Sequence, residues 1–209
     1  MKSILYIHGM GGGADSRIPS ILAEALVGRV DVCVRTYDFD PEIAWGQICS
    51  WVEEVKPDLV IGESLGSLHA MRIRKVPLLF VSPALNAPLY FELMAWLTLI
   101  PGMTLLFDRI YRPREGDRQK LHFTYRTLRK YRSYRKVAIQ IATSQHKDRS
   151  FHAFFGNADH YRKTGVVSLK TWTKYFGDSY CLYEGTHFME DIPIAEDLIP
   201  AICNILNIK

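Results

Sequence analysis

The sequence has few of the residues that hold small secreted domains and metal-binding modules together. It contains four cysteines in 209 residues, and none of them forms a C-x-x-C pair or a zinc-finger spacing. A chain of this length buries about 70% of its unfolded surface, so it needs neither disulfides nor a structural metal. The cysteines lie among apolar residues, as buried free thiols in a reducing compartment do. They are Cys33, Cys49, Cys181 and Cys203.

Long apolar segments of the targeting and membrane-spanning kinds are also missing. The apolar run over residues 3–7 is too short for a signal peptide before His8, so we expect a cytoplasmic protein. Residues 89–107 have the length and apolar content of a membrane span, but Glu92 and a Pro-Gly break at 101–102 argue against one. We expect no membrane span and interpret this stretch as part of a cap over a cleft.

The net charge is modest, at +4, but it is unevenly distributed. Residues 109–149 contain 13 lysines and arginines against three acidic residues, while the rest of the chain contains 13 against 19. Such a basic segment either attracts an anionic partner or substrate group, or forms the solvated face of a helix, which is the more usual outcome. Tyrosine and arginine together can stack on bases, but no nucleic-acid-binding signature accompanies them, so we expect no nucleic-acid partner.

Short apolar runs alternate with amphipathic stretches through most of the chain. The runs are continuously apolar, as in strands that are covered on both faces, and strands that alternate with helices imply a parallel sheet. We predict a single α/β domain over residues 1–209, a three-layer doubly wound parallel sheet of about six strands. The predicted strands are Ser3–His8, Val30–Phe39, Asp58–Glu63, Pro77–Ser82, Phe151–Gly156 and Ser179–Glu184, and the predicted helices are Arg17–Gly28, Ile43–Lys56, Ser64–Lys75, Val166–Phe176 and Ile192–Leu206.

The residues between the fourth and fifth predicted strands fit no simple crossover, and we interpret residues 85–150 as a helical cap insertion. The first half is rich in large apolar residues such as Phe91, Met94 and Trp96. Apolar surface of this extent can line an acyl pocket or bury a homodimer contact. The second half, Arg112–Lys136, is predicted as a basic helical region.

The strongest functional signal is a G-x-S-x-G motif centred on Ser64, directly after an apolar strand and before a helix. At such a tight turn the serine takes a strained conformation that projects its hydroxyl above the sheet. Glycines are needed at 62 and 66 because side chains there would collide with the neighbouring strand and helix. The motif predicts a nucleophile, whereas the structural alternative is a glycine-rich turn with a helix-capping serine.

A serine nucleophile needs a base, and the base needs an orienting acid. Asp159 follows the fifth predicted strand and His187 follows the sixth. Since the carboxyl ends of parallel strands lie at one edge of a sheet, both side chains should converge there with Ser64. Each residue alone fits an ordinary loop equally well. Their joint occurrence at three strand ends indicates a catalytic triad.

With these residues in place, the sequence resembles the α/β-hydrolase superfamily, in particular its short bacterial serine esterases. The resemblance covers nearly the whole chain outside the insertion. It implies the strand order 2-1-3-4-5-6, without the two antiparallel strands of larger members. The segments that carry it are His8-Gly9, Gly62-Glu63-Ser64-Leu65-Gly66, Gly156-Asn157-Ala158-Asp159 and Gly185-Thr186-His187.

The resemblance implies a serine hydrolase that cleaves a small-molecule carboxylic ester or thioester through an acyl-enzyme at Ser64, with no cofactor and no metal. Two N–H donors must then face the developing oxyanion. The first predicted donor is the backbone N–H of Leu65, at a helix N-terminus. By analogy with the family, Met10 supplies the second. The run of glycines leaves the register of this loop open, and Gly11 is the alternative donor.

Other functions fit the sequence less well. The glycine loop 9–14 matches a relaxed dinucleotide fingerprint, but no acidic residue stands at the expected distance at the end of the second strand. A P-loop is excluded, since no Gly-Lys-[Ser/Thr] follows. A catalytically silent binding protein of the same fold and an acyltransferase with the same triad stay open. The spacing of His146, His152, Asp159 and His160 is too loose to predict a metal site.

Overall fold

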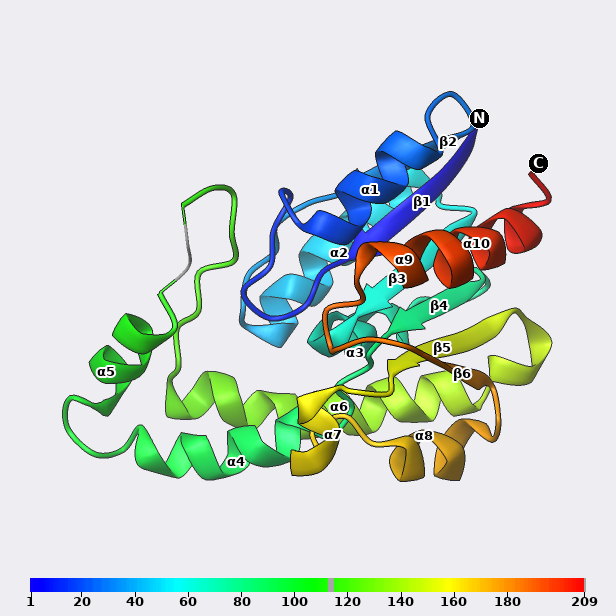
Figure 1. The fold of residues 1–209 in the computed structure, drawn as a ribbon. Coiled ribbons are helices and arrows are strands. Elements are labelled where there is room, and N and C mark those ends of the chain that lie inside the picture. The colour runs from blue at the N-terminus through cyan, green and yellow to red at the C-terminus, as the bar shows by residue number, and fades with distance from the viewer. Residues whose placement is uncertain (113–114, 209) are drawn as a thin grey trace.

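A six-stranded sheet lies between two layers of helices in the computed structural model, which describes residues 1–112 and 115–208 (Figure 1). The strand order is β2-β1-β3-β4-β5-β6, and every neighbouring pair is parallel. The predicted α/β class and the strand order implied by the resemblance are therefore confirmed. The strands are β1 (Lys2–Ile7), β2 (Val30–Val34), β3 (Leu59–Glu63), β4 (Leu78–Val81), β5 (Phe151–Gly156) and β6 (Tyr180–Tyr183).

Helices cover both faces of the sheet, with α1 and α10 on one face and α2, α3, α6 and α8 on the other (Figure 1). The two faces bury alternate residues of the same strand, as Ile4 and Leu5 of β1 do, both fully buried. This double burial explains why the strands are continuously apolar. The helices are α1 (Arg17–Ala25), α2 (Pro41–Val55), α3 (Ser67–Ala70), α6 (Tyr125–Thr143), α8 (Leu169–Phe176), α9 (Asp191–Pro193), the π-helical turn η3 (Ile194–Leu198) and α10 (Ile199–Leu206).

Strand β2 is shorter than predicted, ending at Val34 instead of Phe39. Its neighbour in the sheet, β1, pairs with it only as far as Tyr6, because the glycine loop follows soon after. Residues 35–39 therefore leave the sheet. The aromatic rings of Tyr37 and Phe39 become buried in the core beneath that loop, which is why the segment carries large apolar residues although it is not a strand.

Helix α6 lies within residues 85–150 but belongs to the helical layer of the sheet. It connects β4 to β5 and buries Leu128, Tyr131 and Tyr134 in the same core cluster as α2 and α8. Three of its basic residues form ion pairs: Lys130 contacts Asp40 at 2.7 Å, and Arg129 and Arg132 contact Glu92. These three residues of the basic run thus connect α6 to Asp40, at the start of α2, and to Glu92.

Helix α4 (Ala87–Leu97) lies against α6, and α5 (Met103–Ile110) stands apart from the three layers (Figure 1). Helix α5 has no buried residue, and its Leu105 is 75% exposed. On α4, Phe91 and Ala95 are buried, while Leu93 and Trp96 are more than half exposed. The pair therefore presents an apolar outer surface. No helix among the described residues is long and apolar enough to cross a membrane.

Candidate active site

The turn after β3 holds Ser64 in the geometry that its motif predicts. Ser64 has φ +49°, in the left-handed region that non-glycine residues rarely adopt. It begins the short 3₁₀ turn η1 (Ser64–Gly66), which leads into α3. A Cβ on Gly62 would lie 2.8 Å from the Cβ of Ala70, and one on Gly66 would overlap the carbonyl oxygen of His8. Both glycines are therefore required by close packing around the turn.

The three residues of the predicted triad meet at the carboxyl edge of the sheet. Nε2 of His187 lies 2.9 Å from Oγ of Ser64, and its Nδ1 lies 2.8 Å from Oδ2 of Asp159. His187 and Asp159 are 4% and 3% exposed, so water is largely excluded from their hydrogen bond. Oδ1 of Asp159 accepts from the backbone N–H of Tyr161 at 2.8 Å, at the start of α7 (His160–Thr164). This cap fixes the carboxylate that faces the imidazole.

The loop that carries His187 is held by side chains that the sequence did not reveal. Glu190 accepts hydrogen bonds from the backbone N–H and the hydroxyl of Thr186, which hold the pKa of its carboxyl below the usual value. The hydroxyl of Tyr183 donates to the carbonyl of Thr186 at 2.7 Å and lies 3.1 Å from the hydroxyl of Ser82. These bonds connect the loop to the ends of β6 and β4. A phenol and a carboxylate close to a histidine in sequence gave no signal specific enough to predict this.

The glycine loop after β1 forms a tight turn around a buried histidine. The Gly12 N–H donates to the carbonyl of Gly9 at 3.0 Å, and Gly11 has φ +74° at the third position, as a type II turn requires. Nδ1–H of His8 donates to the same carbonyl at 2.7 Å. Burial lowers the pKa of His8 to about 4, so its imidazole is neutral at physiological pH. The ring stacks on Tyr37, whose hydroxyl donates to the carbonyl of His8 at 2.5 Å.

Two backbone N–H groups beside Ser64 remain available for a ligand. The Met10 N–H makes no hydrogen bond within the described residues. The Leu65 N–H lies in the first turn of η1, where amides have no acceptor inside the helix. Gly11, the alternative donor, is engaged: its N–H donates to Oε1 of Gln119 at 3.0 Å. This arrangement favours Met10 and Leu65 as the donors.

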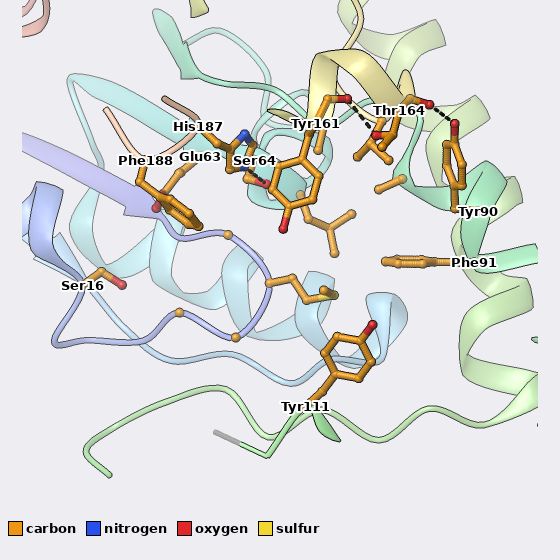
Figure 2. A pocket seen from close by; sticks show the side chains of 18 of the residues that line it. Ser16, Glu63, Ser64, Tyr90, Phe91, Tyr111, Tyr161, Thr164, His187 and Phe188 are labelled. Atoms are coloured by element: carbon orange, nitrogen blue, oxygen red, sulfur yellow. Dashed lines mark hydrogen bonds between the residues drawn. The ribbon is translucent and has the colours of Figure 1, made fainter. Parts of the chain in front are cut away.

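A cavity of about 580 Å³ opens in front of Ser64 and His187. Figure 2 shows Phe91 and Tyr111 on the side facing the cap, and Tyr161 and Phe188 beside the histidine. Apart from the triad and the glycine loop, these walls are mainly apolar or aromatic. Among the described residues, no three histidine, cysteine, aspartate or glutamate side chains are arranged to hold a metal ion.

Sequence comparison identifies no relative: no protein-family model and no curated protein sequence matches the chain. Solved structures match it over nearly its whole length. A carboxylesterase of the thaumarchaeon Nitrososphaera gargenis has a TM-score of 0.58 and 11% identity, covering 99% of this chain and 91% of the esterase. Est1E from Butyrivibrio proteoclasticus, solved with ferulic acid, has a TM-score of 0.60 and 16% identity, covering 99% and 90%.

The thioesterase domain from the curacin biosynthetic pathway is similar too, with a TM-score of 0.55 and 16% identity over 99% of this chain and 91% of that domain. Likeness at such low identity concerns the fold, and it agrees with the sheet order and with the serine turn at the end of β3. The chain has the α/β-hydrolase fold.

Proposed function

We propose that the protein is a serine hydrolase that cleaves a carboxylic ester or thioester through an acyl-enzyme at Ser64. The observation that carries this proposal is the continuous hydrogen-bond chain from Asp159 through His187 to the Ser64 hydroxyl, which ends at the wall of an apolar cavity. A helix-capping serine would have no need of a buried imidazole on its hydroxyl, nor of a buried carboxylate behind that imidazole.

The geometry fits the acylation half of such a reaction. Oγ of Ser64 attacks the substrate carbonyl carbon while Nε2 of His187, 2.9 Å away, takes the hydroxyl proton. The carboxylate of Asp159 stabilises the imidazolium that forms. The N–H groups of Met10 and Leu65 then donate to the oxyanion of the tetrahedral intermediate. Collapse of this intermediate expels the alcohol or thiol, which leaves with the proton from His187.

Deacylation uses the same groups with water in place of the leaving group. His187 removes a proton from a water molecule that attacks the acyl carbon, and a second tetrahedral intermediate forms on the same donors. Its collapse releases the carboxylic acid and returns the proton to Oγ of Ser64. An acceptor alcohol or amine in place of water would make the protein an acyltransferase.

The walls of the cavity favour an acyl group larger than acetyl. Phe91 and Met94 of α4, with Val166, supply apolar surface within the same cavity as Ser64. Each methylene buried there adds up to about 0.8 kcal/mol of binding free energy. In a series of p-nitrophenyl esters and acyl thioesters, kcat/KM should therefore rise from acetyl to medium chains. A flat profile would remove the acyl role of these walls.

Labelling by a fluorophosphonate and hydrolysis of p-nitrophenyl esters test the proposed function. The wild-type protein should be labelled at Ser64, and Ser64→Ala should abolish labelling and lower turnover by several orders of magnitude. Ser133→Ala, on an exposed residue of α6, is the matched control and should leave both unchanged. A protein with no labelling would be a binding protein of this fold. Transfer of the acyl group to a small molecule, without release of free acid, would indicate an acyltransferase.

A further inference from the structure

A segment of the cap crosses directly over the glycine loop. We call residues 116–119 the strap. Its backbone pairs with the loop: Gln119 N–H donates to the carbonyl of Gly12 at 2.7 Å, and Ala14 N–H donates to the carbonyl of Asp117 at 3.1 Å. Gly13 and Arg118 form an antiparallel β-bridge between the two segments. Segments more than 100 residues apart in sequence thus behave as one small ladder beside Ser64.

The side chain of Gln119 is the deepest part of the strap, at 1% exposed. Its Oε1 accepts from the Gly11 N–H at 3.0 Å, and its Nε2 donates to the carbonyl of Asp38 at 3.3 Å. Both ends of the amide are therefore used, one on the glycine loop and one on the segment that follows β2. A buried amide with both ends satisfied is oriented in a single way.

The hydrogen bond from Gly11 to Gln119 holds the central peptide of the turn, which can rotate between two orientations. In a β-turn, type I and type II conformations differ by rotation of the central peptide, here the one that joins Met10 to Gly11. The φ of +74° at Gly11 shows which orientation this turn has. Glycine adopts both orientations with little cost, so the sequence of the loop does not select between them. Gln119 selects one by accepting the Gly11 N–H.

Selection of this orientation bears on the preceding peptide, Gly9–Met10, which carries the Met10 N–H, because both peptides belong to the same turn. The Met10 N–H makes no hydrogen bond among the described residues, and Met10 lines the cavity beside Ser64. We propose that Gln119 is a positioning residue: its hydrogen bond to the Gly11 N–H fixes the conformation of the turn that presents the Met10 N–H to the oxyanion. This inference rests on the proposed function.

Gln119→Met tests the inference, because methionine has a similar length but cannot accept the Gly11 N–H. The kcat for a p-nitrophenyl ester should fall about 10- to 100-fold, as expected when a reacting group is misplaced, while KM changes less than about twofold. Inhibition by a trifluoromethyl ketone, which forms an oxyanion on Ser64, should weaken in proportion to the loss in kcat/KM. Gln119→Glu retains an acceptor for Gly11 but loses the donor to the Asp38 carbonyl, so it should lose less kcat than Gln119→Met.

The matched control is Thr36→Val, at a residue outside the strap that hydrogen-bonds to it. The Thr36 hydroxyl donates to the carbonyl of Asp117 at 3.0 Å and accepts from Ala14 at 3.1 Å, without contact to Gly11. Thr36→Val should lower the melting temperature, as Gln119→Met does, but should leave kcat unchanged. An equal loss of kcat in Thr36→Val and Gln119→Met would overturn the positioning role, because any loosening of the strap would then suffice.

A measurement on the wild-type protein does not depend on any variant folding. In hydrogen exchange followed by NMR, the Gly11 amide should be protected at least about tenfold more than the Met10 amide, since only the first is hydrogen-bonded. Equal exchange of the two amides would contradict the proposed role of Gln119 on its own. A wild-type protein with neither ester turnover nor labelling at Ser64 would instead overturn the proposed function, and this inference with it.

Discussion

A Cβ atom on Gly9 would lie 3.0 Å from the Cβ of Ser64. The loop with the candidate oxyanion donor thus packs directly against the candidate nucleophile, with no space for a methyl group between them. Ser64 cannot move away, because Gly62 and Gly66 confine its turn on both sides. The separation between nucleophile and donor is therefore set by the absence of a side chain at position 9.

Gly9→Ala should push the glycine loop away from Ser64 by a few tenths of an ångström. We expect kcat to fall by about tenfold or more, because the oxyanion donors act only at the correct distance, while the protein still folds. Gly46→Ala is the control: Gly46 lies within α2 with nothing within 4 Å of the added methyl, so it should stabilise the fold by about 1 kcal/mol. Steady-state kinetics and urea unfolding of both variants check this. Normal kcat in Gly9→Ala would show that the loop is not the donor.

Met10→Pro removes one backbone N–H and leaves the turn intact. Proline is favoured at the second position of a type II turn, which is where Met10 lies. If that N–H stabilises the oxyanion, its removal should cost about 2.7–4 kcal/mol of transition-state stabilisation, measured as a fall in kcat/KM. Met10→Ala retains the N–H and should cost much less. Equal losses in the two variants would mean that Met10 acts through its side chain.

Substitution of His187 and Asp159 tests their proposed roles as base and orienting acid. His187→Ala should lower turnover by several orders of magnitude, and Ser64→Ala combined with it should be scarcely worse, because the residues act as a unit. Asp159→Asn should also be severe, since an amide does not stabilise the imidazolium. Stopped-flow measurement of the first turnover separates chemistry from binding. Near-normal activity of Asp159→Asn would contradict Asp159 as the acid.

The convergence of Ser64, Asp159 and His187 could be predicted because each follows a strand in a local pattern, and a parallel sheet brings those patterns to one edge. Ser64 stands between two glycines at the end of β3, and Asp159 and His187 follow β5 and β6. The supports of the site were not predictable in this way. Gln119 and Tyr37 act on the glycine loop through contacts that span 108 and 29 residues, and such pairings depend on how the cap and the segment after β2 fold back.

The fold was predictable to a similar degree. Continuous apolar runs predicted the strands. Buried residues are apolar whether or not they pair with a neighbouring strand, so such runs do not show where a strand ends. For this reason the second strand was drawn through Tyr37 and Phe39, which are buried in the core outside the sheet. In α6 the many basic residues drew attention to its exposed face. Its buried face, where Leu128 and Tyr131 pack beneath the sheet, was therefore not predicted.

Two buried histidines should make the stability fall at mildly acidic pH. Burial lowers the pKa of His8 to about 4, and burial together with the nearby Arg72 lowers the pKa of His69 to about 3. In the unfolded chain both histidines take up a proton near pH 6.5, whereas in the folded protein they remain neutral at that pH. The free energy of unfolding should therefore be level above pH 7 and fall below about pH 6.5, by up to about 1.4 kcal/mol per pH unit for each histidine.

His69→Gln tests this slope, because glutamine does not titrate and can still bond to the hydroxyl of Tyr134, which lies 2.7 Å from Nδ1 of His69. Urea unfolding between pH 7.5 and 5.5 should show a shallower decline in the variant than in the wild-type protein. Surface carboxylates titrate mainly below this interval and contribute equally to both proteins. The same slope in both would mean that His69 is protonated in the folded state.

On α4 and α5, exposed apolar residues and buried ones should affect the free energy of unfolding very differently. Leu105 is 75% exposed, so Leu105→Glu should change the free energy of unfolding by less than about 0.5 kcal/mol. Phe91, at 5% exposed and in ring contact with Phe39 and Tyr131, faces the core, and Phe91→Ala should cost about 3–5 kcal/mol.

A homodimer, one of the two uses that the sequence left open for the apolar surface, would use that same outer face. In sedimentation equilibrium the wild-type protein should then associate with rising concentration, and Leu105→Glu should remain monomeric, since a second copy would have to bury the new carboxylate without a partner. Thr98→Ser, on a half-buried residue between the two helices, is the control and should associate as the wild type does. Identical masses for all three proteins at every concentration would show that α4 and α5 do not pair with a second copy, which would leave the lining of the cavity beside Phe91 as the contribution of these helices.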